Sequence, residues 1–484
     1  MRSFNKPYRK REGWYRPRAY SHFDEPISEA RAAQLVTDPE AVARHAFFPF
    51  IKRVVRVDRY KANDSGTKEV KLKKRPICFA SHVDSHVFAY YADILTKAYD
   101  DRLDGEVCEP CVIAYRSLSK TNIHFAAEAF DDIRQNAPCA VLAFDVKSFF
   151  DTLDHDLLKR EWAALLEVDR LPDDHYAVFR TVTRFAFVKE RRLKKLFQKH
   201  YIQRKKDRRR RGRKGRRPRV PRICSPQQFR DRVRREKDRG RSLIAVNEAG
   251  KGIPQGSPIS AVLANLYMLP FDLAFEAYVS KVGGVYRRYS DDLLVICPLD
   301  KAVEVEKTVN EMIAERKIKL GKEKTERFVA KPVQDTLSIT KMRADGTDTG
   351  EAAEVQYLGF VFDGKVVRLR PNSLTKYYRR MGRAVMREKE RVQEARKTGE
   401  DAQFSSRRLY RGYSHVGSTN FPRYAYRAAK EMNSPAIRRQ LRRHAMTLDS
   451  LLKRHEQGYA KRIARNQAHR QNDKARRSVR NTKG

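Results

Sequence analysis

The stretch that decides the fold is Val285-Tyr-Arg-Arg-Tyr-Ser-Asp-Asp-Leu-Leu-Val-Ile296, in which two β-type runs meet at a pair of acids. A tight turn between the runs predicts a β-hairpin that holds Asp291 and Asp292 still and close together. Neighbouring carboxylates repel each other unless cations lie between them. The turn therefore indicates a site for divalent metal ions.

A third acid stands in a similar setting, because Asp145 follows the apolar run from Cys139 to Phe144, which predicts a strand. Phosphoryl transfer from a nucleoside triphosphate uses two magnesium ions about 3.5–4 Å apart, and such hard cations prefer carboxylate oxygens. We predict that Asp145 and Asp291 bridge two Mg²⁺ ions, for which Mn²⁺ can substitute. Asp292 would be the accessory acid, and the Val146 carbonyl a backbone ligand. The alternative, a plain turn pair at residues 291–292, leaves Asp145 unexplained.

The second element is the segment Gly252-Ile-Pro-Gln-Gly-Ser-Pro-Ile-Ser260, which leads into a helical pattern. Its glycines and prolines predict a tight loop at a helix N-terminus, where a nucleotide and a template base can lie against backbone. An ordinary capped helix is the alternative. Elsewhere, periodicity predicts helices over 82–100, 120–136, 300–318 and 371–398, and β-hairpins over 52–80 and 354–370.

Four motifs occur in the order of the reverse transcriptase palm: Phe144 to His155, Gly252 to Ser260, Tyr289 to Asp292, and Tyr357 to Phe360. Over residues 45–370 the chain resembles bacterial reverse transcriptases related to those of group II introns and retrons. The resemblance implies an α+β right-hand polymerase fold with fingers, palm and a mainly helical C-terminal thumb. The boundaries we expect are a basic arm 1–27, fingers 28–138, palm 139–370 with a basic insert 189–243, thumb 371–460 and a basic tail 461–484.

The resemblance also implies a nucleotide site formed by Arg75, Phe150, Gln255, Gly256 and Lys324. Phe150 falls where the family has an aromatic steric gate, whose ring would clash with a ribose 2′-OH and so select deoxynucleotides. A core phenylalanine is the alternative there. Arg75 matches the fingers arginine that grips the triphosphate, with a solvated hairpin charge as the alternative. Lys324 matches a lysine near the nucleotide.

Departures from the family's usual pattern narrow the subgroup. Ser290 stands where group II and retron enzymes commonly have Ala, and Ala114-Tyr-Arg116 replaces their Gly-Phe-Arg-like element. Residues 408–415 and 420–426 resemble the C-terminal helical region of the bacterial "unknown group" enzymes, which include phage-defence reverse transcriptases. The resemblance therefore implies an anti-phage role and a cytoplasmic bacterial location.

The charge of the 484-residue chain is strongly positive, with a formal net charge of +44 that is unevenly spread. Residues 189–222 hold 19 Lys and Arg against two acids, and 1–18 and 460–484 are also strongly basic. A polyanion is the natural partner, with an affinity that falls as salt rises. A solvated tail is the alternative, but we predict contact with nucleic acid through the arginine run Arg208, Arg209, Arg210, Arg211 and Arg213.

Tyrosines lie among the cations of the N-terminal arm, which we expect to be extended. Tyr8, Tyr15 and Tyr20 are spaced as base stacking would require. The expected partners are an RNA template, in this class often a non-coding RNA, together with a DNA product and deoxynucleoside triphosphates. The sequence leaves open whether the protein forms a homo-oligomer.

The six cysteines are scattered, and only Cys108-Glu-Pro-Cys111 has metal-like spacing. It lacks a second Cys or His pair, so we expect no zinc there and reduced thiols throughout. No run of about 18 apolar residues predicts a membrane span, and the basic N-terminus lacks the apolar segment of a secretory signal.

Two other functions stay open at this stage. An RNA-dependent RNA polymerase would share the palm and its metals, although Phe150 argues against it. A maturase-like RNA-binding protein would keep the palm as a scaffold, although the intact acids Asp145, Asp291 and Asp292 argue against that.

Overall fold

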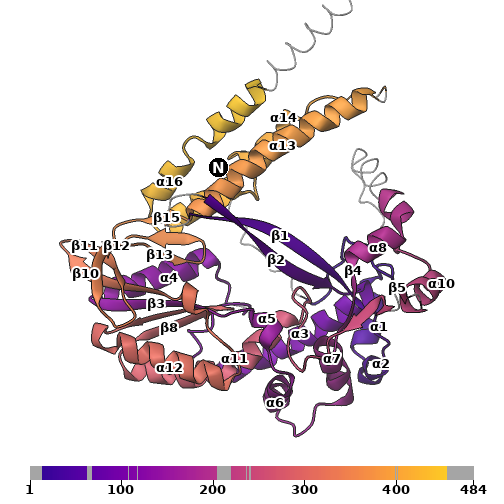
Figure 1. Cartoon of the computed structure of the whole chain (residues 1–484), viewed down its shortest axis with the longest axis horizontal. Coiled ribbons are helices and arrows are strands. Elements are labelled where there is room, and N and C mark those ends of the chain that lie inside the picture. The colour runs from indigo at the N-terminus through magenta and orange to yellow at the C-terminus, as the bar shows by residue number, and fades with distance from the viewer. Residues whose placement is uncertain are drawn as a thin grey trace, which may run out of the picture. The chain divides into compact units, whose positions relative to one another are not determined.

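The computed structural model describes residues 13–62, 68–106, 108–116, 118–203, 220–235, 237–238, 241–397, 399 and 402–454 (Figure 1). The chain divides into two compact units. The first unit comprises residues 1–117, 142–297 and 301–326, and the second comprises 118–141, 298–300 and 327–484. Both units contain helices and strands, which confirms the predicted α+β class. The expected boundaries of arm, fingers, palm, thumb and tail stay predictions.

The N-terminal segment of the first unit is folded onto a helix. Helix α3 (His82–Leu103) begins with two caps, because the Ser81 side chain accepts from a backbone N–H and so does Asp24. The Asp24 carboxylate takes the N–H groups of His82 and Val83 at 2.9 and 2.8 Å. These donors have no partner inside the helix, so each cap stabilises its start. The segment around residue 24 therefore belongs to the folded body.

Two of the three arm tyrosines, which we predict to stack on bases, pack against histidines of the protein. The Tyr15 ring stacks on His86 with centroids 4.7 Å apart, and its hydroxyl donates to the Ile27 carbonyl. The Tyr20 ring stacks on His82, and its hydroxyl donates to the Ala80 carbonyl at 2.9 Å. Both rings thus pack within the protein, and their stacking on bases stays a prediction. Tyr8 lies outside the described residues.

A long hairpin dominates the sheet of this region. Strands β1 (Phe50–Ala62) and β2 (Lys68–Phe79) pair antiparallel from Ile51↔Phe79 to Ala62↔Lys68, as the sequence predicts for 52–80. β4 (Ala186–Lys189) and β7 (Ile244–Val246) complete the order β2-β1-β4-β7. The accompanying helices are α1 (Glu29–Val36), α2 (Pro39–Ala43), α5 (Phe149–Thr152), α6 (His155–Leu165) and α7 (Asp173–Thr183).

The flanks of the basic insert contribute to a core although the segment is strongly charged. Helix α8 (Glu190–Leu196), α10 (Pro226–Phe229) and the π-helical turn Arg230–Arg235 carry apolar residues inward. Leu193, Phe197, Ile223, Cys224 and Val233 form one buried cluster with Phe23, Ile51 and Val188. The short pair β5 (Lys237–Asp238) and β6 (Arg241–Ser242) follows. The run Arg208–Arg213 lies outside the described residues.

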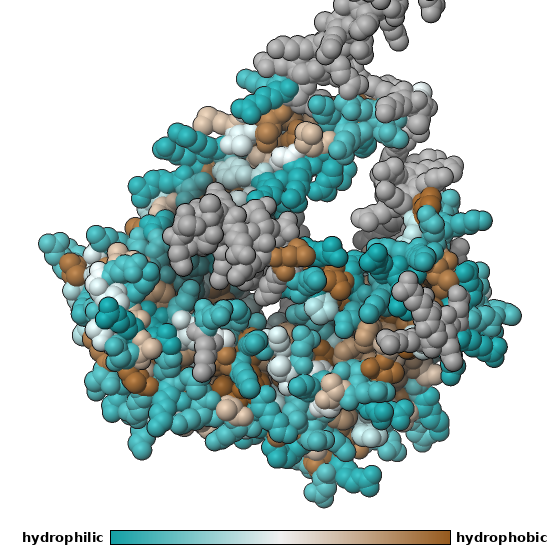
Figure 2. Space-filling view, in the orientation of Figure 1, coloured by the Kyte–Doolittle hydropathy of each residue, from teal (hydrophilic) through white to brown (hydrophobic). Residues whose placement is uncertain are grey.

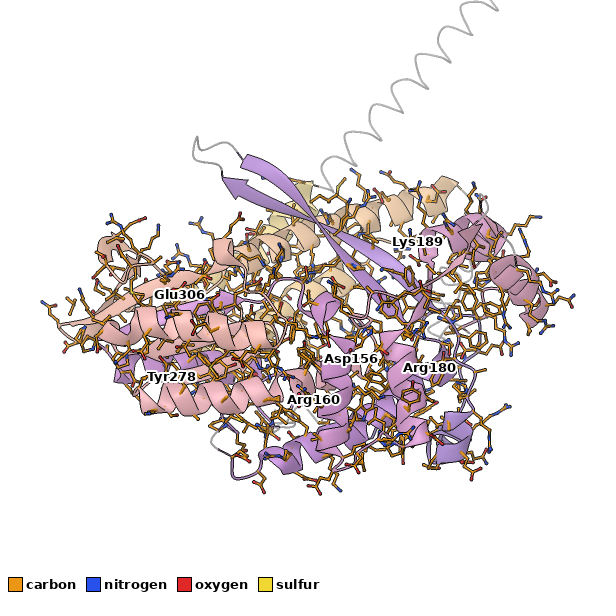
Figure 3. The ribbon with its side chains drawn as sticks, turned by 60° about the horizontal axis from the view of Figure 1, so that its bottom comes forward. Asp156, Arg160, Arg180, Lys189, Tyr278 and Glu306 are labelled. Atoms are coloured by element: carbon orange, nitrogen blue, oxygen red, sulfur yellow. The ribbon has the colours of Figure 1, made fainter. Side chains whose placement is uncertain are left out.

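The strands that carry the acids lie side by side in the first unit. β8 (Val285–Tyr289) and β9 (Asp292–Cys297) form the predicted hairpin, and the order is β3-β9-β8 with β3 (Cys139–Asp145). Helices α11 (Ser260–Lys281) and α12 (Ala302–Glu315) pack together, marked by Tyr278 and Glu306 in Figure 3. Along β9, Leu293 to Cys297 are all buried.

Helix α11 is the one helix in the described ranges that is long and apolar enough to cross a membrane by length and composition. In its apolar window 72% of the residues are buried inside the protein, as in a core helix. The face of the molecule in Figure 2 is mostly hydrophilic with scattered apolar residues.

The second unit contains helix α4 (Asn122–Gln135) and two groups of strands. The first group is β10 (Glu326–Val333), β11 (Thr336–Met342) and β12 (Asp348–Ala352), and the second is β13 (Val355–Tyr357), β14 (Phe360–Phe362) and β15 (Val367–Leu369). The C-terminal helices are α13 (Pro371–Lys397), α14 (Ser406–Tyr413), α15 (Phe421–Glu431) and α16 (Pro435–Leu441), followed by helical residues 444–454. The hairpin predicted over 354–370 is thus a three-stranded sheet.

Candidate active site

The acid turn is built as the sequence predicts. β8 ends at Tyr289 and β9 begins at Asp292, and these two residues pair across the hairpin. Ser290 takes the left-handed backbone conformation with φ +63°, which a two-residue hairpin loop requires and which few residues other than glycine adopt. The Ser290 side chain is buried and accepts a hydrogen bond from the Tyr115 hydroxyl at 3.2 Å. The buried Ser290 side chain therefore anchors the turn to the protein, while Asp292 is exposed to solvent.

A buried ion pair supports this turn. Arg288 is fully buried, and its Nε donates to the Asp272 carboxylate on α11 at 2.8 Å. A second nitrogen of the guanidinium pairs with the other oxygen of Asp272. Although burial lowers the pKa of Arg288, the Asp272 charge more than offsets this effect, so the pKa lies above its ordinary value. The guanidinium stays charged under the turn.

The same guanidinium reaches the turn itself. Its Nη1 donates to the Ser290 carbonyl at 3.3 Å and to Asn265 Oδ1 at 3.2 Å. The amide of Asn265 in turn donates to the Ala114 carbonyl at 2.8 Å. The Arg288 backbone is held as well, because its N–H donates to Cys111 and its carbonyl accepts from Ile113. The 108–116 segment thus braces strand β8 and the acid turn.

Asp145 is joined to the turn through backbone. The Val146 N–H donates to the Asp291 carbonyl at 2.9 Å, so the two predicted metal-ligand segments lie next to each other. The Asp145 carbonyl accepts from the Gly321 N–H at 2.9 Å. The Asp145 carboxylate forms an ion pair with Lys324. The structure thus brings Lys324, predicted to lie at the nucleotide, onto Asp145, a predicted metal ligand.

No group of three or more His, Cys, Asp or Glu side chains in the described part of the chain lies close enough to hold a metal ion. The donor set nevertheless fits a hard divalent cation, because three carboxylates stand on two segments joined by the bond between Val146 and Asp291. The Lys324 ammonium on Asp145 is itself a cation at that carboxylate. The predicted ligands are thus of the right chemistry, and Asp145 already pairs with positive charge.

The Gly252–Ser260 loop packs backbone against backbone. The Gln255 carbonyl accepts from the Cys78 N–H at 2.8 Å, and the Ile253 N–H donates to the Phe150 carbonyl at 2.8 Å. Gly256 has φ +107°, and a Cβ there would lie 2.9 Å from the Cys78 carbonyl oxygen. Glycine is therefore required at this position by both conformation and space. The loop is fastened to β2 on one side and to α5 on the other.

The predicted nucleotide residues are distributed around this loop. Arg75 lies on β2 opposite Val55, with its side chain exposed, three residues before the strand contact at Cys78. Phe150 is half-buried on α5, its ring centroid 5.6 Å from that of Phe149, which is buried. The loop therefore joins the elements that carry Arg75, Phe150, Gln255 and Gly256.

Sequence reasoning missed Arg288, Asp272, Asn265 and Tyr115. One signal was available, since Asp272 is a carboxylate inside the mainly apolar run of 260–281 and such a group requires a partner. A second was the period of β8, in which Tyr286 and Arg288 share the buried face. Neither signal identifies which cation pairs with which acid.

Residues 239–362 match a family model described as reverse transcriptase (RNA-dependent DNA polymerase). The match includes the Gly252–Ser260 loop and the acid turn, whereas Asp145 lies outside it. No curated protein matches the chain.

Telomerases are among the solved structures that the chain resembles. The telomerase of Candida albicans in complex with a TWJ fragment of telomeric RNA has 11% identity and a TM-score of 0.43, over 88% of this chain and 58% of that one. The apo telomerase of Candida tropicalis truncated from its C-terminal domain has 10% identity and a TM-score of 0.38, over 66% of this chain and 57% of that one. The chain thus spans less than two thirds of these telomerase chains. The acid turn lies inside the family match, and by that match residues 239–362 of this chain are similar to the reverse transcriptase (RNA-dependent DNA polymerase) family.

Proposed function

We propose that this protein is an RNA-directed DNA polymerase that adds deoxynucleotides to a growing strand on an RNA template. The observation that carries the proposal is the acid turn Asp291-Asp292, which lies in the reverse transcriptase match and is bonded through the Asp291 carbonyl to the Val146 N–H beside Asp145. Three acids on two adjoining segments are what phosphoryl transfer with divalent cations requires.

In this proposal Asp145, Asp291, Asp292 and the Val146 carbonyl hold two Mg²⁺ ions. Bound Mg²⁺ supplies charge neutralisation at the reacting phosphates. Lys324 pairs with Asp145 in the structure, and a cation held by that carboxylate would displace its ammonium. A triphosphate offers the displaced ammonium a new anionic partner, which agrees with the predicted place of Lys324 at the nucleotide.

The remaining nucleotide residues have separate tasks. Arg75, exposed on β2, grips the triphosphate, since a guanidinium binds phosphate oxygens with two parallel donors. Gln255 and Gly256 support the base pair from the loop. Phe150 excludes the 2′-OH of a ribonucleotide by steric clash.

The test is incorporation of deoxynucleotides on a primed RNA template by the purified chain. Asp291→Ala should lower incorporation at least about 100-fold, because a metal ligand is lost. Asp156→Asn is the matched control, since Asp156 is an exposed acid of the same unit on α6 (Figure 3) and should leave activity unchanged. Equal activity of wild type and Asp291→Ala would refute the proposal.

An RNA polymerase is distinguished by the choice of nucleotide. Wild type should use deoxynucleotides, and Phe150→Ala should admit ribonucleotides because the ring no longer occupies the space of the 2′-OH. Ribonucleotide use by wild type, unchanged in Phe150→Ala, would favour the RNA polymerase instead.

We further propose that the template is a dedicated non-coding RNA and that the enzyme acts in anti-phage defence in a bacterial cytoplasm, with a homo-oligomer open. The net charge of +44 and the resemblance of residues 408–415 and 420–426 to the "unknown group" enzymes support this. Sequencing the RNA and DNA that co-purify with the chain should return one abundant RNA and its complementary DNA. Plating phage on cells with wild type or Asp291→Ala/Asp292→Ala tests the role, and protection by the double variant would favour a maturase-like RNA-binding protein.

A further inference from the structure

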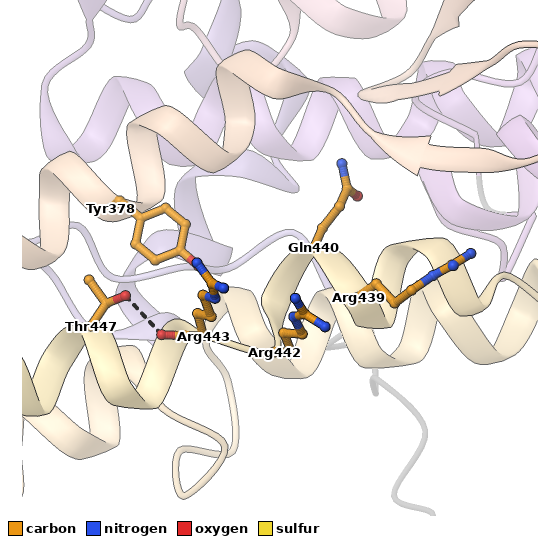
Figure 4. A pocket seen from close by; sticks show the side chains of 6 residues that line it. All are labelled: Tyr378, Arg439, Gln440, Arg442, Arg443 and Thr447. Atoms are coloured by element: carbon orange, nitrogen blue, oxygen red, sulfur yellow. Dashed lines mark hydrogen bonds between the residues drawn. The ribbon is translucent and has the colours of Figure 1, made fainter.

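A basic pocket lies in the second unit, and none of the residues that line it has been assigned a role above. It has a volume of about 360 Å³ and is shown in Figure 4. Helix α16 and the residues that follow it line one side, and α13 contributes the facing aromatic ring. The lining residues are Tyr378, Arg439, Gln440, Arg442, Arg443 and Thr447.

A glutamine anchors the wall of the pocket to a strand, while the arginines of the pocket are exposed to solvent. The Gln440 amide clamps strand β15, since its Oε1 accepts from the Leu369 N–H at 2.9 Å and its Nε2 donates to the Leu369 carbonyl at 3.1 Å. Ile437 and Leu441 are fully buried beneath the helix. Arg439, Arg442 and Arg443 are exposed. Arg439 lies on α16 and Arg442 and Arg443 lie in the turn that follows it, and all three line the pocket.

No acid lines the pocket, and within the described residues none of its three arginines has an ion pair. Two carboxylates on the helical segments that contribute to the pocket have partners of their own. Asp449 accepts from the Tyr410 hydroxyl, and Glu388 pairs with Arg391 and accepts from the Ser405 N–H. Three positive charges therefore stand together without a negative partner, and their mutual repulsion favours binding of an anion.

Tyr378 gives the pocket an aromatic wall. The preceding Tyr377 is turned inward, where its ring stacks on Phe421 at 4.8 Å and its hydroxyl donates to the Tyr413 carbonyl. Tyr378 is half-buried beside the arginines, and burial, then the neighbouring Tyr426, raises the pKa of its hydroxyl. The ring thus stays neutral and adds no negative charge to the pocket. A flat aromatic ring beside guanidinium forks fits a ligand that combines bases with phosphates.

We propose that this pocket binds a single strand of RNA, with backbone phosphates on Arg439, Arg442 and Arg443 and a base against Tyr378. The inference rests on the proposed function for the choice of RNA among polyanions. It does not depend on catalysis, because none of the pocket residues belongs to the active site.

The experiment measures binding of a labelled single-stranded RNA of about 20 nucleotides to the full chain carrying Asp291→Ala/Asp292→Ala, across a salt series. The triple variant Arg439→Gln/Arg442→Gln/Arg443→Gln should bind at least about tenfold more weakly near 150 mM salt. Its slope of log affinity against log salt should fall by about 2, since three phosphate contacts are lost.

The matched control removes the same charge elsewhere. Arg160→Gln/Arg170→Gln/Arg180→Gln changes three exposed arginines of the first unit, of which Arg160 and Arg180 are labelled in Figure 3. It should bind RNA within about twofold of the parent with an unchanged salt slope. Equal weakening of both triple variants would overturn the proposal, because net charge alone would then explain the effect.

Two further variants separate the ring from the charges and guard against misfolding. Tyr378→Phe should keep RNA affinity, whereas Tyr378→Leu should lose it about fivefold or more, since only the leucine removes base stacking. Arg439→Lys/Arg442→Lys/Arg443→Lys keeps the charge and should retain more affinity than the glutamine triple. Equal affinity of Tyr378→Phe and Tyr378→Leu would overturn the role of the ring.

The chemical class of the ligand is tested by competition. Unlabelled single-stranded RNA should displace the probe, and an acidic peptide such as polyglutamate at equal charge should not. Displacement by the peptide as strong as by RNA would overturn the choice of nucleic acid. Deoxynucleotide incorporation, measured separately on the chain with intact acids, reports on the proposed polymerase alone, so the two proposals fail independently.

Discussion

At the scale of single residues, Arg288 connects the buried interior of the first unit to the acid turn. It is buried with Asp272, and it donates to the carbonyl of Ser290 in the acid turn. A buried pair is costly to break, because the remaining charge loses both its partner and water. Arg288 therefore links the stability of the first unit to the placement of the turn.

We expect Arg288→Met to lower the free energy of unfolding by about 3–5 kcal/mol, since Asp272 is left as an unpaired buried charge. Denaturant unfolding measures this change. The double variant Arg288→Met/Asp272→Leu should recover most of the stability but not the deoxynucleotide incorporation, because the donor to Ser290 is still missing. Full recovery of incorporation in the double variant would show that Arg288 acts on stability alone.

Glu276 on α11 predicts a dependence of stability on pH. Burial raises the pKa of its carboxyl to about 7, and the hydrogen bond from Ser280 and the charge of Arg287 only partly oppose this. The folded state therefore keeps a proton that the unfolded chain releases at its ordinary pKa of 4.5. Proton binding by Glu276 therefore stabilises the folded state fully below pH 4.5. This stabilisation is lost as the pH rises to about 7 and is absent at higher pH.

The free energy of unfolding of wild type, measured with denaturant, should be lower near pH 8 than near pH 5. Glu276 should account for about 2 kcal/mol of this difference. Glu276→Gln should lose that share of the difference, because the amide does not titrate. Glu311→Gln, an exposed acid on α12, is the control and should keep the wild-type difference. An unchanged pH dependence in Glu276→Gln would contradict the assignment.

Two residues noted in the sequence as departures from the related enzymes touch each other. Ser290 stands in the acid turn and Tyr115 in the 108–116 segment, and the Tyr115 hydroxyl donates to the Ser290 side chain at 3.2 Å. The local pattern predicts each residue's place in the chain, but the pairing depends on the tertiary fold. A single sequence holds no signal for such a partner 175 positions away.

At the scale of elements, the Gly252–Ser260 loop joins β2 to α5, so its conformation is set on both sides. Gly256→Ala should disturb it, since the added Cβ would lie 2.8 Å from Ile77 Cγ2 at a backbone φ of +107°. We expect a weaker apparent affinity for deoxynucleotides, by about tenfold, because one tightly packed backbone position must move. Steady-state incorporation at varied nucleotide concentration measures it.

Gly250→Ala is the matched control for the loop. Gly250 also has a positive φ of +64°, but a Cβ there would meet nothing within 4 Å. It should therefore cost some stability and leave the nucleotide dependence unchanged. Equal effects of the two alanines on nucleotide affinity would attribute the loss to backbone strain rather than to the contact with β2.

Elements with a strong local pattern were predictable. The alternation in residues 52–80 predicts the β1–β2 hairpin, and the periodicity of 82–100 and 300–318 predicts α3 and α12. The part that sequence reasoning missed is capping and packing by distant residues. Asp24 caps α3 across 58 positions, and His86 and His82 take the rings of Tyr15 and Tyr20. Aromatic and acidic residues in a basic segment are equally consistent with ligand binding and with packing or capping inside the protein. Composition alone therefore does not distinguish these roles.

At the scale of the whole molecule, the net charge of +44 makes salt the main control on RNA binding. Deleting the entire stretch 189–222 is a poor test of the insert, because it removes Leu193 and Phe197 from a buried cluster. Deleting only residues 204–219 removes the arginine run and spares that cluster. We expect this deletion to leave thermal unfolding within about 3 °C of wild type and to lower the salt slope of RNA binding.

The matched comparison for the deletion replaces residues 204–219 by a glycine–serine segment of equal length. Both changes should weaken RNA binding alike, since the charges and not the chain length are responsible. A salt slope equal to that of wild type in both would contradict a role of the arginine run in RNA contact.

The bracing of strand β8 has a consequence for modularity. Cys111, Ile113 and Ala114 hold Arg288 and Asn265, yet all three lie upstream of the 239–362 match, as does Asp145. A fragment cut at the limits of the match would leave Asp272 and Arg288 without their surroundings and the acid turn without its third acid. The unit of sequence similarity is thus smaller than the unit that folds, and the acid turn of this protein cannot be exchanged between chains unless the 108–116 segment is transferred with it.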